Sequence, residues 1–486
     1  MEEYNKITNQ LIFIYGIKIL DFFFNFILFL VLARSLSQHE FGIYSIISIS
    51  ILIITNIFDL GLSTFILKDL SGKDKGIQKA NFGKIFSFAL IEIGIIGFIL
   101  LTIGYFIIKY LGYSDISHLF FFAIIIAGII ILGNFMVNYV LLSKQSPKAK
   151  IIEFLIQSAW ILPLIIITLF YRLNIDYIFE TKLILSLTVL LCIVYYFKRK
   201  GVMFLTRLDN GYIKKAMIFG LPLSLLSLSQ LLISGADRYI IGLFQSADAV
   251  GSYSYIYSLL NIILVFFIAS IDTVLYPYII TAFNKNDLNK SNFLLNASLK
   301  YSLLLTLPGV VGFFILSSEI ISLISGTKYI GTVSIIPFLI LFPVLQCLIV
   351  VIQKTLLMRG KTLELSYIFV MGAIVNIVLN FILVPRYSYY GAGIALTLTY
   401  IILAIALIVR SKNFIKYDYK YLRLERILLS TIMMAFLISF IHPQSLIGKI
   451  MTVILGLLVY IVGLYVTKAY VSEEMTLIKS FFTFKR

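Results

Sequence analysis

The chain has 486 residues, of which 60% are hydrophobic and only 13% are charged. No water-soluble fold of this length could bury so much apolar surface, so a soluble enzyme or binding domain is excluded. The formal net charge of +17 comes from basic residues scattered over short loops, and we therefore expect no nucleic-acid partner.

Long apolar stretches follow one another along almost the whole chain. A helix needs about 20 mostly apolar residues to cross a bilayer, and about fourteen stretches meet that requirement. They are too long, and alternate too little, for transmembrane β-strands. We predict an all-α polytopic membrane protein with spans at 10–33, 42–67, 85–108, 118–142, 151–171, 182–197, 217–243, 252–281, 301–325, 332–353, 364–385, 391–410, 427–442 and 449–467.

The orientation follows from the basic residues, which are retained on the cytoplasmic side of a membrane. With a cytoplasmic N-terminus, almost all Lys and Arg fall in inside segments. Lys18 and Arg238 are expected to be the only basic residues within spans. The outside loops hold Arg34, Lys109, Arg172, Lys182, Lys328, Arg386 and Lys449. We predict a multi-pass protein of the cytoplasmic membrane with both termini in the cytoplasm.

The two halves of the chain resemble each other. LARSLSQHEFGIYSIIS after the first span is similar to IGLFQSADAVGSYSYIYS after the seventh, which aligns Gly42 with Gly251. Six helices separate the copies, so both have the same orientation and form parallel repeats. We expect a six-helix lobe at 1–200, a linker at 201–216 and a second six-helix lobe at 217–410. The segment 411–486 would hold a second linker, two extra helices and a cytoplasmic tail.

Polar residues within the first span need a reason, because a charge at the bilayer centre costs about 2.5–3.5 kcal/mol. Lys18, Asp21 and Asn25 are spaced three and four residues apart and share one helix face. Either Lys18 and Asp21 neutralise each other locally, or this face lines a water-filled cavity in which Lys18 can bind an anion.

The seventh span carries a longer polar stripe that ends next to Arg238. Hydrogen bonds between helices could explain two or three such residues. A stripe over four turns of an apolar helix favours a cavity-facing surface. The stripe consists of Ser224, Ser227, Gln230, Ser234 and Asp237.

Other polar residues lie within spans. Asp59 and Asp272 occupy equivalent places in the two halves and are either structural caps or ion sites, and Glu92 is a further buried acid. Asn376 and Asn380, one helical turn apart, are best explained by helix packing. Neither a phosphate loop nor a metal-ligand spacing of His or Cys occurs, so we expect no catalytic residue, metal or cofactor.

Several motifs together resemble a known family. They are Gly220-Leu-Pro222, Asp237-Arg238, the stretch 376–385 and Gly391-Ala-Gly-Ile-Ala395. In this order they resemble the bacterial polysaccharide or O-antigen repeat-unit flippases of the multidrug/oligosaccharidyl-lipid/polysaccharide exporter superfamily. One departure is Ser388, which stands where the family pattern has the first glycine of Gly-x-x-Gly.

The resemblance implies two lobes around a central cavity and a polyprenyl-diphosphate-linked oligosaccharide as substrate. Lys18 and then Arg238 would bind the diphosphate. The sugar would be bound by Asn25, Ser227, Gln230 and Ser234. The lipid tail would stay among membrane lipid, and a polysaccharide polymerase and chain-length proteins are candidate partners.

Two other functions stay open. A drug or cation antiporter of the same superfamily would exchange its substrate for H⁺ or Na⁺ on Asp21, Asp59, Glu92 and Asp237. The number of spans and the polysaccharide-type motifs argue against it. A membrane glycan polymerase or ligase would need a substantial external loop, and all the expected outside loops are short.

Overall fold

The computed structural model describes residues 2–110, 117–143, 145–202, 205–441, 443 and 445–469. For 2–9, 11–12, 105–110, 263–270 and 272–274 it describes the backbone only. The described part is helical and contains no strand. It includes 10 helices long and apolar enough to cross a membrane, or 11 if one bent pair forms a single span. The predicted all-α membrane fold is confirmed.

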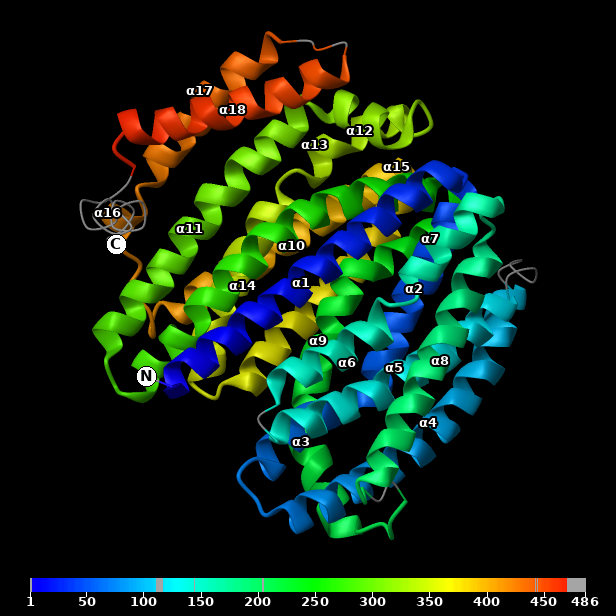
Figure 1. Ribbon diagram of the computed structural model, residues 1–486. Helices are drawn as coiled ribbons and strands as arrows, with labels where there is room; N and C mark the ends of the chain where they lie inside the picture. Colours follow the sequence, from blue (N-terminus) through cyan, green and yellow to red (C-terminus); the bar gives the residue numbers. More distant parts are fainter. Residues whose placement is uncertain are drawn as a thin grey trace. The chain divides into compact units, whose positions relative to one another are not determined.

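The chain divides into two compact units, and the first comprises residues 1–251 and 369–377. Its helices, in blue to green in Figure 1, are α1 (Glu2–Ser35), α2 (Gln38–Asp59), α3 (Leu62–Leu70), α4 (Lys75–Tyr110), α5 (Ser117–Leu142), α6 (Ser146–Gln157), α7 (Ile161–Phe170), α8 (Ile175–Arg199) and α9 (Asn210–Phe244).

Helix α5 forms the centre of this unit and packs against α2, α3, α4, α6 and α8. Its side chains Ile126, Ala127 and Phe135 are fully buried. On the outer helices, in contrast, Phe98 and Phe170 are 68% and 76% exposed. Exposed side chains of this kind on apolar helices long enough to cross a bilayer are typical of a surface that faces lipid.

The second unit comprises residues 252–368 and 378–486. The antiparallel pair α17 and α18, shown in orange and red in Figure 1, packs on α11. Helix α10 begins in the first unit and continues into this one. The helices are α10 (Ala247–Asn284), α11 (Leu288–Ile315), α12 (Ser317–Ser325), the 3-10 helix η2 (Ile330–Ile335), α13 (Ile336–Leu339), α14 (Phe342–Met358), α15 (Thr362–Ser411), α16 (Tyr419–Leu422), α17 (Leu424–Ser439) and α18 (Leu446–Val466).

Side-chain caps fix where several helices begin. Ser37 accepts a hydrogen bond from the Glu40 amide at 3.1 Å, and Glu40 accepts one from the Ser37 amide at 2.8 Å. This reciprocal pair starts α2 directly after α1. The side chains of Asp209 and Asp287 each accept one main-chain hydrogen bond and so cap the starts of α9 and α11.

Four expected spans are not continuous helices. The segment 301–325 is divided at Leu316 into α11 and α12, and 332–353 is divided among η2, α13 and α14. The segment 42–67 is broken at Leu60 and Gly61, both of which have positive φ. A Cβ on Gly61 would come within 2.2 Å of the Gly220 carbonyl oxygen, so the backbone of α9 packs against this break. The segment 151–171 is likewise divided into α6 and α7 by residues 158–160.

Helix α15 has 50 residues and would be about 75 Å long if straight, far more than the roughly 30 Å core of a bilayer. It is interrupted at Ser388, with φ 54° and ψ −144°, between the expected spans 364–385 and 391–410. The expected spans 252–281 and 427–442 fall in α10 and α17. The number of fourteen spans and the lobe boundaries stay predictions.

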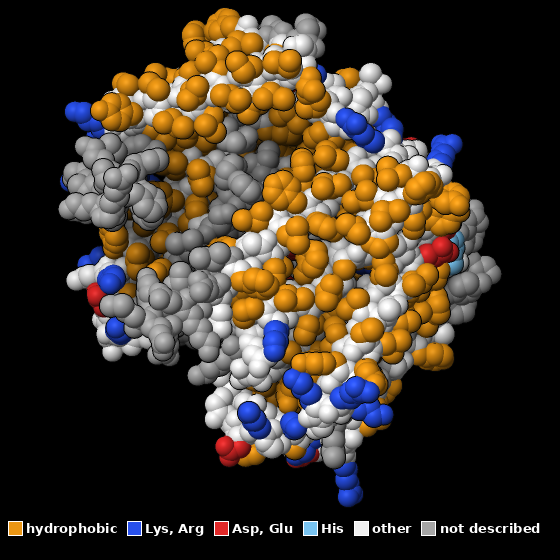
Figure 2. All heavy atoms as spheres, viewed as in Figure 1, with side chains coloured by type: hydrophobic (Ala, Val, Ile, Leu, Met, Phe, Trp, Pro, Cys, Tyr) orange, Lys and Arg blue, Asp and Glu red, His pale blue; other side chains and the backbone are white. Residues whose placement is uncertain are grey.

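Basic side chains gather at one end of the first unit. Figure 2 shows apolar side chains over its helices and many Lys and Arg at its lower end. Figure 1 places α3, the start of α4 and the end of α8 at this end. These helix ends and the loop residues next to them carry Lys68, Lys73, Lys75, Lys79, Lys198, Arg199 and Lys200. This grouping fits the charge asymmetry seen in the sequence.

Candidate functional site

A polar cluster forms in the first unit where α1 meets the break between α6 and α7. The Ser158 hydroxyl in the break donates a short hydrogen bond to the Asp21 carboxylate. Asn25 donates to the same carboxylate oxygen at 3.2 Å and to the Asp21 main-chain oxygen at 2.8 Å. The predicted shared face of Asp21 and Asn25 therefore exists, and its carboxylate is held by two donors.

The break itself has further polar contacts. The Trp160 indole donates to the Gln157 carbonyl at 2.8 Å, and Ser186 of α8 donates to the Ile156 carbonyl at 3.2 Å. The Lys182 ammonium lies 5.1 Å from the centre of the Trp160 ring. Interrupted spans with exposed main-chain polar groups are typical of binding regions in membrane transporters.

Lys18 lies one turn before Asp21 on α1, and its side chain is exposed. Its ammonium is 6.0 Å from the centre of the Tyr15 ring. Lys150 and Glu153 of α6 act on it electrostatically, with opposite effects on its charge. Lys18 thus stands close to the helix that carries the break.

The polar stripe of α9 is only partly open. Ser227 and Ser234 donate to main-chain oxygens of their own helix at 3.1 and 3.2 Å. Asp237 is fully buried, and Arg238 is 6% exposed. The Arg238 guanidinium donates to Asp237 at 3.3 Å and to the Ser234 carbonyl at 2.7 Å. The charge of Arg238 is therefore already balanced within α9.

Helix α9 is fixed against α2 along its length. The Tyr239 and Ser50 hydroxyls lie 2.7 Å apart. Near the other end of α2, a Cβ on Gly42 would come within 2.0 Å of the Ala247 carbonyl oxygen at the start of α10. Backbone approaches this close leave room only for glycine.

Two of the predicted acids interact electrostatically. Asp59 accepts a hydrogen bond from the Ser63 amide, in the first turn of α3, at 3.0 Å. The Glu92 side chain of α4 is 7% exposed, and Asp59 is its main charged neighbour. Neither Glu92 carboxylate oxygen has a hydrogen-bond partner within the described residues.

The remaining predicted residues lie elsewhere. Asn376 and Asn380 are both fully buried on α15. The side chain of Asp272 falls outside the described residues. Three or more potential metal ligands nowhere gather within the part of the chain that is described.

Two buried basic residues lie on helices at positions where the sequence predicts loops. Lys300 on α11 and Lys354 on α14 are 0% and 5% exposed, so the expectation that only Lys18 and Arg238 lie within helical spans is wrong. Both lie close to tyrosine rings, at 4.7 Å from Tyr421 and 4.9 Å from Tyr276 respectively. Both helices are longer than the apolar stretches from which the spans were predicted. The two lysines, expected in loops, therefore lie within helices.

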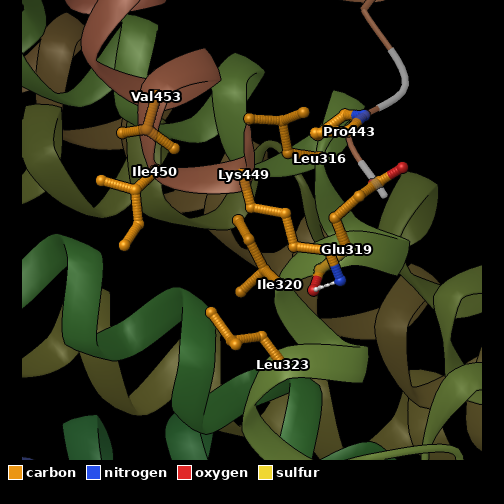
Figure 3. A pocket seen from close by; sticks show the side chains of 8 residues that line it. All are labelled: Leu316, Glu319, Ile320, Leu323, Pro443, Lys449, Ile450 and Val453. Carbon is orange, nitrogen blue, oxygen red and sulfur yellow. Dashed lines mark hydrogen bonds between the residues drawn. The ribbon is translucent and has the colours of Figure 1, made fainter. Parts of the chain in front are cut away.

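A recess that is partly open to its surroundings lies between α12 and α18 in the second unit. Figure 3 shows its apolar lining and the Lys449 ammonium next to the Glu319 main-chain oxygen. Lys449 also donates to the Ser322 hydroxyl at 3.0 Å, so its charge serves to join α18 to α12. The recess is suited to an apolar chain. Its lining residues are Leu316, Glu319, Ile320, Leu323, Pro443, Lys449, Ile450 and Val453.

Comparison with known proteins gives two family matches. A profile described as polysaccharide biosynthesis protein matches residues 7–283, and one described as MatE matches residues 222–382. Two relatives come from Haloferax volcanii. The probable low-salt glycan biosynthesis flippase Agl15 is 23% identical over 47% of this chain and 49% of its own length. The probable flippase AglR is 26% identical over 36% of this chain and 37% of its own length. The chain therefore aligns with half or less of each relative.

Among solved structures, the chain is similar to the lipid II flippase MurJ in an inward closed conformation. The TM-score is 0.75 at 16% identity, over 93% of this chain and 98% of that one. An inward-facing multidrug resistance MATE family transporter gives a TM-score of 0.60 at 15% identity, over 81% and 94%. These likenesses concern the fold. Since the first profile covers more than half of the sequence, the chain belongs to the polysaccharide biosynthesis protein family, within the multidrug/oligosaccharidyl-lipid/polysaccharide exporter superfamily.

Proposed function

We propose that this protein flips a lipid-linked oligosaccharide across the membrane, from the cytoplasmic to the outer leaflet. The observation that carries the proposal is membership of the polysaccharide biosynthesis family, together with two relatives named as probable flippases, one of them for glycan biosynthesis. The finer substrate we propose is a polyprenyl-diphosphate-linked repeat unit of a polysaccharide. A polymerase and chain-length proteins would then act on the product.

The polar residues of the first unit supply the chemistry that such a substrate needs. A diphosphate requires cationic partners out of bulk water. Lys18 is an exposed cation beside the interrupted helix, and we propose it as the first contact. Amides and hydroxyls such as Asn25, Ser227, Gln230 and Ser234 would bind the sugar.

Arg238 would act later, because its guanidinium is engaged by Asp237 and the Ser234 carbonyl. A diphosphate would have to replace the Ser234 contact, and the two charges of Asp237 and Arg238 would then separate. We propose alternating access as the transport cycle. An inside-negative membrane potential favours outward movement of an anion by about 2.3 kcal/mol per charge per 100 mV.

The test uses proteoliposomes that contain a fluorescent polyprenyl-diphosphate oligosaccharide, with flipping measured by a membrane-impermeant quencher. We expect the double variant Lys18→Ala, Arg238→Ala to lose most of the flipping activity. Lys148→Ala, which removes an exposed positive charge from the first turn of α6, should flip normally. Undiminished flipping by the double variant would rule out the proposed cationic contacts.

Orientation is tested separately by labelling single cysteines. We propose that both termini and the loop 205–209 before α9 face the cytoplasm. A cysteine introduced at Leu208 should be protected from an impermeant thiol reagent in intact cells. Labelling of Leu208→Cys from outside would contradict this topology.

A second candidate function is exchange of a drug or cation for protons. Two observations favour it: the buried Glu92 carboxyl group, which has no hydrogen-bond partner in the part of the chain that is described, and the MatE match over residues 222–382. Proton-driven efflux of a cationic dye in the same proteoliposomes, without glycan flipping, would establish that alternative.

A further inference from the structure

Lys182 is a basic residue on a membrane-length helix, and the sequence predicts it in an outside loop. In the structure α8 begins seven residues earlier, at Ile175, which corresponds to about 10 Å of helix. The whole of α8, Ile175–Arg199, is apolar and long enough to cross a membrane. Lys182 therefore lies within the span, where a positive charge requires a reason.

The side chain of Lys182 is directed towards the break between α6 and α7. Its ammonium lies 5.1 Å from the centre of the Trp160 ring in that break. One turn further along the same face of α8, Ser186 donates to a main-chain carbonyl of α6 at 3.2 Å. The opposite face of α8 carries the exposed, lipid-facing Ile184 and Leu191. Protein atoms surround Lys182, yet part of its side chain stays accessible, as is typical of a residue that lines an internal space.

No acidic group balances the charge of Lys182 within the described residues. No carboxylate lies within 4.0 Å of its ammonium, and no charged residue acts on it electrostatically. Glu180 is exposed and, two positions earlier, lies on the opposite side of α8. The Asp21 carboxylate is held by two other donors. The Trp160 ring offsets only part of the cost of taking a cation out of water, so the surroundings of Lys182 favour an anion.

We propose that Lys182 binds a negatively charged oxygen group, a phosphate or a carboxylate, on the head group of the transported lipid. This inference rests on the proposed function and adds a substrate contact to Lys18 and Arg238. The ammonium would donate charge-assisted hydrogen bonds, which are stronger than those between neutral groups. Contact with the Trp160 ring would hold the ammonium in place before the anion arrives. Arg238 has to give up its contact with Asp237 to bind an anion, whereas Lys182 has no ion pair to break among the described residues.

Binding of three lipid probes to the purified full-length protein in detergent tests this proposal. The first is a polyprenyl diphosphate that carries a neutral disaccharide, and the second has a uronic acid in that disaccharide. The third carries the neutral disaccharide on polyprenol without phosphate and is uncharged. We expect Lys182→Gln to weaken binding of at least one anionic probe roughly tenfold, as loss of one charge-assisted hydrogen bond implies, and to leave the uncharged probe unaffected.

Two further variants serve as controls. Lys182→Arg keeps the charge and should keep the binding of the anionic probes. Lys148→Gln removes an exposed cation from the first turn of α6 and should bind all probes as the wild type does. Lys182→Met, which has a side chain of similar length without charge, takes the place of Lys182→Gln if that variant does not fold.

The two anionic probes separate the sources of the anion. A loss for both assigns Lys182 to the diphosphate, and a loss for the uronic acid lipid alone assigns it to the sugar carboxylate. Unchanged binding by Lys182→Gln, an equal loss for the uncharged probe, or an equal loss in Lys182→Arg or Lys148→Gln would overturn this inference and leave the proposed function in place. If the wild type binds none of the three probes, the proposed function is overturned and this inference with it.

Discussion

Ser388 interrupts α15 in a backbone conformation that strongly favours glycine, with φ 54° and ψ −144°. A non-glycine residue in such a region costs about 1–3 kcal/mol. Ser388→Gly should remove this cost. The glycine also makes the unfolded chain more flexible, which lowers the free energy of unfolding by about 0.5–1 kcal/mol. We therefore expect a net stabilisation of about 0.5–2 kcal/mol.

Gly326 provides a matched control. It ends α12 with φ 68° and ψ −142°, almost the same conformation, and a Cβ there would meet nothing within 4 Å. Gly326→Ser should thus introduce the strain that Ser388→Gly removes, without a clash. The double variant should return close to the stability of the wild type, because the two sites are distinct and their effects add.

The assay is thermal unfolding of the purified protein in one detergent, followed by intrinsic fluorescence. For a chain of this length, 1 kcal/mol corresponds to roughly 1 °C, so we expect a shift of about +0.5 to +2 °C for Ser388→Gly and a similar decrease for Gly326→Ser. Hydrogen exchange of residues 384–392 should slow in Ser388→Gly. A decrease in stability for Ser388→Gly would refute the strain argument.

Three further predictions concern the first unit. Gly42→Ala should sharply reduce the amount of folded protein recovered in size-exclusion chromatography, because its Cβ would come within 2.0 Å of the Ala247 oxygen. Gly16→Ala is the control, since a Cβ there has nothing within 4 Å, and its recovery should match the wild type. Equal recovery of both variants would contradict the packing at Gly42. Burial of Asp69 opposes its ionisation, but hydrogen bonds from Lys215, Lys73 and Tyr212 outweigh this effect and lower its pKa from 3.8 to about 2. The stabilising effect of the ionised Asp69 is therefore complete above about pH 4 and is lost as the pH falls towards 2. Over this pH range the unfolding temperature of the wild type should change more than that of Asp69→Asn. The same pH dependence in both proteins would count against the proposed contacts of Asp69. Glu92→Gln should unfold at the same temperature as the wild type or slightly higher, since it replaces a buried carboxyl group whose two oxygens have no partner among the described residues. A marked decrease would mean that the carboxyl group is satisfied in the membrane.

The sequence was sufficient for the fold class because hydropathy and charge are local properties. Each span needs only its own apolar residues, and the side of the membrane follows from nearby Lys and Arg. The shared face of Asp21 and Asn25 could be predicted for the same reason, since both lie on one helix.

The helix breaks could not be predicted because their causes are distant in sequence. Gly61 faces Gly220 of another helix, and Asp21 meets Ser158, which is 137 residues away. The buried Lys300 and Lys354 were placed in loops because an apolar window ends before the helix does. A lone Trp160 next to Pro163 in an apolar segment was the one local sign of the break between α6 and α7.

The glycine contacts between α2 and the chain at α9 and α10 have a consequence for how this protein responds to its surroundings. At Gly42 and Gly61 the main chains touch directly, at Ala247 and Gly220 respectively. Such contacts gain their energy from dispersion forces between atoms that are already close, and they owe nothing to the exclusion of water. Exchanging lipid for detergent, or changing the acyl chains of the bilayer, should therefore leave these main-chain contacts intact. The ionic contacts of Asp69, in contrast, weaken as salt is added.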